Sequence, residues 1–176
     1  MRYCVAASLD GFIAGPNGEY DWIVPDPAMD FVALWAQFDT VLMGRRTYEV
    51  AKTRRGAFSG SVARWVVVSR TLKPEAGADI ELISDNVAEQ VAALKAQTGK
   101  PEKDIWLFGG GVLFRSLLNA GLVDTVELSV MPVMLGGGVP LLPEGERQVL
   151  QLDESKPLAS GILMLKHSVL PKGKTA

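Results

Sequence analysis

Short runs of apolar residues, each followed by a turn and then by a helical pattern, recur along this chain. Three of the runs are almost uninterrupted, at residues 41–43, 65–68 and 105–108. Such runs are typical of strands in a sheet that is covered on both faces. Their alternation with helical patterns predicts an α/β domain.

The strands and helices expected along the chain fit a single domain. Strands are expected over residues 1–8, 40–43, 64–69, 81–83, 104–108 and 125–131, with a final antiparallel pair at 149–152 and 161–170. Helices are expected over residues 46–51, 87–97 and 112–120. With 176 residues, the chain has the length of a single domain, which we place at 1–171 and follow with a frayed tail at 172–176.

Two further segments are interpreted from their turn and cap residues. Residues 9–25 form a long, turn-rich loop, and loops of this length are more often functional lids than passive connections. A helix is then expected to begin at Asp26, with the aspartate as its N-cap and Pro27 as its first residue. Its buried face would carry apolar side chains at helical spacing, namely Phe31, Leu34, Trp35 and Phe38.

Composition excludes several classes of protein. The net charge of −2 gives no broad basic surface, so binding to bulk nucleic acid is not expected. One cysteine and one histidine exclude a disulfide framework and a Cys/His zinc cluster. No apolar run reaches the roughly 20 residues that span a bilayer, and the N-terminus lacks a signal-peptide pattern. We therefore expect a cytoplasmic protein without a membrane partner.

Each of the three apolar runs ends in residues that suit a phosphate group. The third run passes into three glycines that open a helix, where free amides and the helix dipole favour an anion. The first run ends in a glycine, two arginines and a threonine, and the second in a serine and an arginine. The guanidinium group is a permanently charged, bidentate donor to phosphate. If the strands are parallel, the three turns form one rim, because ligands of open α/β sheets bind outside the carboxyl ends of the strands.

Taken singly, each turn also has a purely structural interpretation. The glycine run would serve a tight strand-to-helix turn, the arginines would be solvated, and the serine turn would be an ordinary polar strand exit. The glycines do not match the G-x-G-x-x-G fingerprint, whose third glycine would fall at Phe114. His167 and Cys4 are expected to be structural, and Trp35, Trp65 and Trp106 to lie in the core.

The residues at these turns resemble the cofactor-binding segments of the dihydrofolate reductase fold. A second set resembles, more closely, the reductase domain of the bifunctional deaminase-reductase of riboflavin biosynthesis. That set comprises Ser8-Leu9-Asp10-Gly11, residues 121–124 (GLVD) with Glu127-Leu128, and residues 131–138 (MPVMLGGG). The deaminase half is not in this sequence, so we expect a stand-alone reductase domain.

This resemblance implies a three-layer α/β/α fold with a mixed, mainly parallel central sheet and a C-terminal antiparallel hairpin. It also implies NADPH as the cofactor and a cis peptide bond between Gly109 and Gly110. The cofactor phosphates would lie against Gly44, Arg45, Arg46 and Thr47, with Arg46, Ser69 and Arg70 at the adenosine 2′-phosphate. The pyrophosphate would lie at Gly109, Gly110 and Gly111, the nicotinamide ribose near Phe114, and the nicotinamide ring against Ala6 and Ala7.

The catalytic candidates are Asp10, Asp30 and Trp22. Folate-reducing enzymes place an acid at the start of the first helix, and both Asp26 and Asp30 lie near that place, although helix capping explains Asp26 equally well. Asp10 belongs to the Ser-Leu-Asp-Gly segment, where a turn role competes. Trp22 lies in the long loop, from which it would line a pocket or simply pack.

Together these features predict an NADPH-dependent reductase of a small pyrimidine- or pteridine-like molecule. Hydride would pass to a heterocyclic C=N bond or to a ribosyl carbonyl or imine, while residues 9–22 close over both ligands. The alternative is a catalytically weak NADP(H)-binding regulatory or sensor domain. The apolar stretch 128–142 is more hydrophobic than a solvated loop requires, and this predicts a homodimer.

Overall fold

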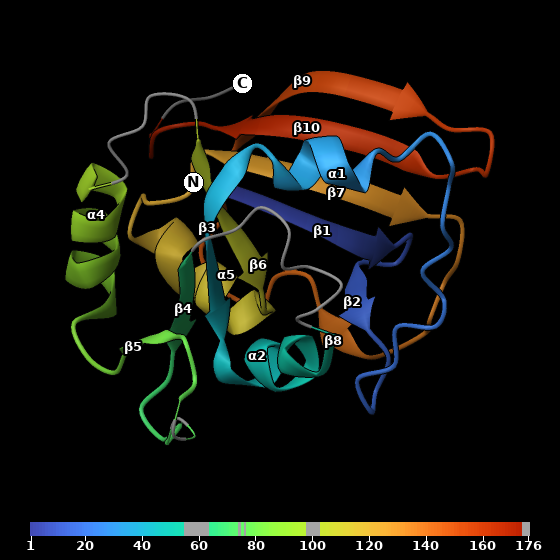
Figure 1. The fold of residues 1–176 in the computed structure, drawn as a ribbon. Helices are drawn as coiled ribbons and strands as arrows, with labels where there is room; N and C mark the ends of the chain where they lie inside the picture. The colour runs from blue at the N-terminus through green and yellow to red at the C-terminus, as the bar shows by residue number, and fades with distance from the viewer. Residues whose placement is uncertain (55–63, 74, 76, 98–102, 174–176) are drawn as a thin grey trace.

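The computed structural model describes residues 1–54, 64–73, 75, 77–97 and 103–173. Eight strands form the main sheet, in the order β5-β4-β3-β6-β1-β7-β10-β9 (Figure 1). They are β1 (Arg2–Ser8), β3 (Phe38–Gly44), β4 (Arg64–Val68), β5 (Glu81–Ile83), β6 (Asp104–Gly109), β7 (Thr125–Met131), β9 (Leu150–Pro157) and β10 (Leu163–Val169).

The sheet is mixed and mainly parallel, as the sequence predicts. All pairs from β5 to β7 are parallel, and only β10 runs antiparallel, to β7 on one side and β9 on the other. The C-terminal hairpin is therefore confirmed, although β9 reaches Pro157 where the pattern predicted an end at residue 152. No helix in the part of the chain that the structure describes is long and apolar enough to cross a membrane.

Helices cover both faces of the parallel part of the sheet. On one face, α4 (Val87–Gln97) and α5 (Gly111–Asn119) bury Val91, Leu94, Leu117 and Leu118 against the strands. On the other face, α1 (Phe31–Trp35) and α2 (Arg45–Ala51) pack Trp35 and Tyr48 into a second core cluster. Side chains alternate along each strand, so Leu42 lies in the first cluster and Val41 and Met43 in the second. The three-layer arrangement is confirmed.

The first helix differs from its prediction. It begins at Phe31, with Asp30 as its N-cap. Asp26 makes a cap-like bond to the amide of Ala28, but only a turn follows it, and its second carboxylate oxygen accepts from the amide of Ser160. It is only five residues long. Phe38 consequently lies at the start of β3, where it is buried, and Phe31 is 50% exposed.

Two segments expected to be loops contain a small sheet of their own. Strand β2 (Phe12–Ala14) pairs antiparallel with β8 (Val139–Pro140). The amide of Leu9 also donates to the carbonyl of Val133 at 2.8 Å, and that of Leu141 to Gly11 at 2.9 Å. Residues 9–14 are therefore joined to residues 133–141 by backbone hydrogen bonds, and only the later part of the long loop lacks such strand pairing.

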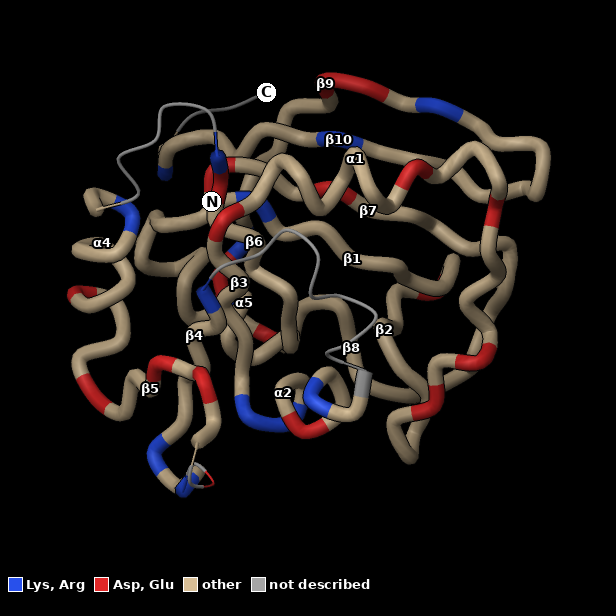
Figure 2. The backbone as a smooth tube through the Cα atoms, viewed as in Figure 1, with Lys and Arg blue, Asp and Glu red and all other residues tan. Residues whose placement is uncertain are grey.

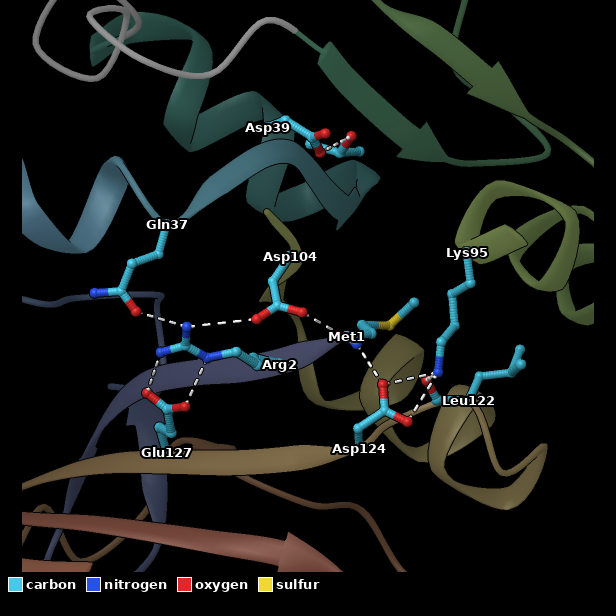
Figure 3. Close-up of polar contacts among 10 residues, drawn as sticks. Met1, Arg2, Gln37, Asp39, Lys95, Asp104, Leu122, Asp124 and Glu127 are labelled. Atoms are coloured by element: carbon cyan, nitrogen blue, oxygen red, sulfur yellow. Dashed lines mark hydrogen bonds and ion pairs between the residues drawn. The ribbon is translucent and has the colours of Figure 1, made fainter. Parts of the chain in front are cut away.

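Ion pairs hold the amino end of β1 (Figure 3). Arg2 donates two hydrogen bonds to Glu127 of β7, at 2.7 and 2.8 Å, and lies 3.6 Å from the carboxylate of Asp104 in β6. The amino group of Met1 pairs with Asp124, which also binds Lys95 of α4. These contacts tie the central strands together at the edge of the sheet where the parallel strands begin.

Candidate functional site

The three glycine and serine turns lie side by side. Strands β4, β3, β6 and β1 are consecutive neighbours and all run parallel, so their carboxyl ends share one edge of the sheet (Figure 1). Gly44 is in register with Val68 of β4, and Met43 with Gly109 of β6. The single rim inferred from the sequence is therefore present.

The turns after β3 and β6 approach each other closely. A Cβ atom on Gly109 or Gly110 would lie 3.5 or 3.6 Å from the hydroxyl oxygen of Thr47, and one on Gly44 would lie 3.9 Å from the Gly109 carbonyl. Gly109 has φ +131°, a conformation that side-chain-bearing residues rarely adopt. The Gly109–Gly110 peptide bond is cis, as expected. Thr47 thus lies directly beside the glycine turn.

Gly111 has a packing role that the sequence did not indicate. A Cβ atom there would lie 2.6 Å from the carbonyl oxygen of Pro140 and 3.1 Å from that of Leu141. The residue is glycine because the backbone around β8 passes directly over it. At Gly109 and Gly110, by contrast, an added Cβ atom would make only ordinary contacts, at 3.5 and 3.6 Å from the Thr47 hydroxyl oxygen.

Among the described residues, no side chain accepts from the first-turn amides at the amino end of α5. Its N-cap is Gly110, which provides no side-chain hydrogen bond. By contrast, the N-cap of α1 is Asp30, whose carboxylate accepts from the amide of Ala33 at 2.9 Å. The first-turn amides of α5, together with the helix dipole, can therefore bind an anionic group.

The arginines at the rim fall into two kinds. Arg45 is held in place: it donates to Glu49 at 2.7 Å and to the hydroxyl of Thr71 at 2.8 Å. Arg46 and Arg70 are exposed and make no hydrogen bond or ion pair with the residues that the structure describes. Their guanidinium groups are free to bind a ligand. Thr71, which follows Ser69 and Arg70 in the turn singled out by the sequence, links the turns after β3 and β4.

Ser69 shapes its own turn. Its hydroxyl oxygen accepts hydrogen bonds from the amides of Thr71 at 3.2 Å and Leu72 at 2.9 Å, and the residue is buried. The hydroxyl hydrogen remains available as a donor. The turn thereby presents Arg70 outward at the end of β4.

Ala6, Ala7 and Phe114, which were expected near the nicotinamide, differ in their burial. Ala6 is half-buried on the face that α1 and α2 cover, whereas Ala7 is buried on the opposite face. Phe114 is 3% exposed and stacks on Tyr3, with ring centroids 3.8 Å apart. The ring of Phe114 is therefore part of the core and is not exposed to a cofactor.

Asp10 has its carboxylate fully engaged within the protein. It accepts from the hydroxyl of Ser8 at 2.6 Å and from the amides of Leu135 at 3.1 Å and Gly136 at 2.7 Å. The Ser8 hydroxyl, followed by the two amides, holds the pKa of Asp10 below its ordinary value. The residue fastens the start of the long loop to the turn after β7, so its turn role is the one the structure supports.

We expect Asp10→Asn to lower Tm by about 2–4 °C, because an amide supplies one acceptor oxygen and turns its NH₂ group toward a backbone donor. Since the folded-state pKa is depressed, the stabilisation is present above the ordinary pKa and is lost as pH falls through the folded one. The difference in Tm between wild type and variant should therefore narrow below about pH 4. Thermal melts across pH 3–7 provide the measurement.

The control for this variant is Asp21→Asn, since Asp21 is exposed and makes no hydrogen bond with the described residues. A hundredfold loss of kcat in Asp10→Asn with unchanged Tm would instead show that the carboxylate acts in the reaction.

The other two catalytic candidates do not converge with Asp10. Asp30 is occupied as the N-cap of α1. Trp22 is partly buried and donates its indole N–H to the carbonyl of Glu19 at 3.0 Å, within the long loop. The structure shows no contact between the glycine turns and either Asp30 or Trp22.

A groove of about 280 Å³ lies elsewhere, between α1 and strands β7, β9 and β10. It is lined by apolar residues of α1 and by charged residues of the strands, among them Glu127, Glu154, Lys156 and Lys166. None of the glycine turns contributes to it, so the groove and the rim are separate features.

Comparison with known proteins agrees with this architecture. The model of the RibD C-terminal domain matches residues 2–164. The uncharacterized protein YyaP of Bacillus subtilis is 36% identical and spans 93% of this chain and 91% of its own length. The riboflavin biosynthesis protein RibD of Mycobacterium tuberculosis is 32% identical over 76% of this chain, which spans 42% of that longer protein.

Solved structures show the same fold. A protein of Shewanella sp. PV-4 assigned to riboflavin biosynthesis has a TM-score of 0.82 and 26% identity, with 97% of this chain and 98% of the other covered. The deaminase and 5-amino-6-(5-phosphoribosylamino)uracil reductase of Thermotoga maritima has a TM-score of 0.71 and 16% identity, covering 96% of this chain and 56% of that one.

Proposed function

The chain belongs to the RibD C-terminal domain family, and from that premise we propose that it is an NADPH-dependent reductase of a pyrimidine- or pteridine-like small molecule. The observation that carries the proposal is the meeting of three anion-binding turns at the carboxyl ends of adjacent parallel strands. The family supports a reductase of the pyrimidine type. The choice of NADPH and of this chain's substrate is our inference.

The residues at the rim fit such a dinucleotide. A Cβ atom on Gly44 would lie 3.9 Å from the Gly109 carbonyl oxygen, and one on Gly110 would lie 3.6 Å from the Thr47 hydroxyl, so neither position is crowded by the protein. The first-turn amides of α5 would bind the pyrophosphate. Arg46 and Arg70 would bind the 2′-phosphate, since both are exposed and neither is paired with a described residue.

Bound NADPH would supply the hydride. The protein would orient the reacting atoms and exclude water from them. Thr47 and Gly44 would border the phosphates, with Arg45 held by Glu49 and Thr71 in the same turn. Ala6 would lie behind the nicotinamide ring. The carboxylates of Asp10 and Asp30 are used by the fold, so neither is proposed as the proton donor.

The test is a fluorescence titration with NADPH and NADH, followed by turnover measurements with pyrimidines and pteridines. We expect NADPH to bind at least tenfold more tightly, because a charge-assisted hydrogen bond to the 2′-phosphate contributes about 1.5–3 kcal/mol. Equal affinities would refute the assignment of the arginines. Tight NADPH binding without turnover of any substrate would favour a regulatory or sensor domain instead.

A further inference from the structure

The side chain of Arg45 bridges two of the turns at the rim. It donates from Nε to a carboxylate oxygen of Glu49 at 2.7 Å and from Nη1 to the hydroxyl oxygen of Thr71 at 2.8 Å. Arg45 and Glu49 belong to α2, whereas Thr71 lies in the turn after β4. In Figure 2 the tube is blue at the start of α2 and again in the segment between β4 and β5. The bridge therefore joins two turns that both carry arginine.

Thr71 is itself held in place by the sheet. Its amide and that of Leu72 donate to the hydroxyl oxygen of Ser69, at 3.2 and 2.9 Å. Ser69 is buried, and its own amide donates to the carbonyl of Ile83 in β5 at 2.9 Å. Leu72 packs against the core cluster that α2 also covers. A continuous series of hydrogen bonds thus runs from β5 through the turn after β4 to α2.

The two acceptors leave most of the Arg45 guanidinium free. This group carries five N–H donors in one rigid plane, and Glu49 and Thr71 accept from one each. The orientation of the remaining three is fixed, because the plane is held at two different nitrogens. Arg46 and Arg70, by contrast, are exposed and unpaired with described residues, so each must be ordered when a ligand binds. Arg45 is thus oriented before a ligand arrives.

The bridge contributes little to the stability of the fold. The side chains of Arg45 and Glu49 are 47% and 42% exposed, and ion pairs between exposed side chains have a small effect on folding. Lys52, at the C-terminal end of α2, makes a further contact to the segment after β4, with Glu75 at 3.0 Å. Loss of the Thr71 hydroxyl should therefore change the orientation of Arg45 and leave the fold intact.

We propose that Thr71 is a positioning residue of the coenzyme site, which holds the Arg45 guanidinium in place for the phosphate assigned to Arg46 and Arg70. The inference rests on the proposed function and adds to it a residue that determines the preference for a phosphorylated coenzyme. Thr71 acts through Arg45: because the guanidinium is held in advance, less side-chain entropy is lost when the phosphate binds.

The experiment measures the Kd of NADPH and of NADH for Thr71→Val, which removes the hydroxyl and keeps the branched side chain. We expect the Kd of NADPH to rise about three- to tenfold, the effect of freeing one long side chain, with the Kd of NADH and the Tm unchanged. Thr71→Ser should keep the wild-type affinities, because it keeps the acceptor. Thr71 is the better position for this test than Glu49, whose substitution would also remove a negative charge near the phosphate.

Thr53→Val is the matched control. Thr53 is also an exposed threonine, and its hydroxyl donates to the carbonyl of Val50 at 2.8 Å, just beyond α2. This variant should leave the affinities for both nucleotides unchanged. In an Arg45→Ala background, Thr71→Val should have no further effect, because the residue through which it acts is gone.

Three results would overturn the inference. They are an unchanged Kd of NADPH in Thr71→Val, an equal loss of NADPH and NADH affinity, and a full effect of Thr71→Val that persists without Arg45, which would make Thr71 a direct ligand. All three presuppose a wild type that prefers NADPH. A wild type without that preference would instead refute the choice of coenzyme in the proposed function, and this inference with it.

Discussion

Replacing Arg46 and Arg70 together by alanine is expected to weaken NADPH binding about 100-fold, while the affinity for NADH changes little. Both side chains are exposed at adjacent strand ends and unpaired with described residues, so their removal leaves no partner unsatisfied. The only free energy lost is that of their hydrogen bonds to the 2′-phosphate, which NADH lacks. Calorimetric titration of both nucleotides measures the difference directly.

Arg147→Ala is the matched control, because Arg147 is also exposed and unpaired with described residues but lies after the turn that follows β8. It removes one positive charge, as each of the two substitutions at the rim does, without touching the rim, and should leave both affinities unchanged. Lysine at positions 46 and 70 should restore only part of the NADPH affinity, since an ammonium group cannot form the bidentate pair. A parallel loss of NADPH and NADH affinity in the double variant would place the arginines at the pyrophosphate instead.

Alanine at Gly110 and alanine at Gly111 are expected to have opposite consequences. At Gly110 the backbone is extended, with φ −97° and ψ −175°, and the new methyl group meets nothing in the protein closer than 3.6 Å. The variant should melt like the wild type, yet its methyl group would occupy the space proposed for the pyrophosphate. We expect NADPH affinity to fall at least about tenfold, the loss of roughly one charge-assisted hydrogen bond.

At Gly111 the new methyl group would lie 2.6 Å from the carbonyl of Pro140, and backbone atoms would have to move. Overpacking of this kind costs about 1–3 kcal/mol, so we expect a lower free energy of unfolding in denaturant titrations. Normal stability of Gly111→Ala, or unchanged NADPH affinity of Gly110→Ala, would contradict the roles assigned to the two glycines.

Much of the sheet could be predicted because its strands are apolar runs with clear ends. The bounds of β5, α4 and β7 are those expected from the sequence. The start of α1 was wrong: Asp26 accepts from the Ala28 amide as a cap would, but only a turn follows, and its second oxygen accepts from Ser160, which lies 134 residues away in the chain. A capping pattern is local, and a contact that only the fold brings near leaves no trace in it.

Contacts between residues far apart in the sequence also limited the prediction of the candidate site. The glycines of the site and the two arginines Arg46 and Arg70 could be picked out from residue type alone, because they follow the apolar strands directly. The engagement of Asp10 by residues 135 and 136, the burial of Phe114 and the contact between Arg45 and Thr71 depend on distant partners. The homodimer stays a prediction: Met134 is 71% exposed, but Leu141 and Leu142 from the same stretch pack against the core.

Strand β8 has contacts on two sides that connect otherwise separate parts of the molecule. Its carbonyl at Pro140 lies over Gly111 at the start of α5, and the strand pairs with β2 at the base of the long loop. A displacement of that base would consequently be transmitted, through two residues of backbone, to the amides proposed to bind pyrophosphate. The position of residues 9–14 and that of the first amides of α5 are thus coupled through the backbone of β8.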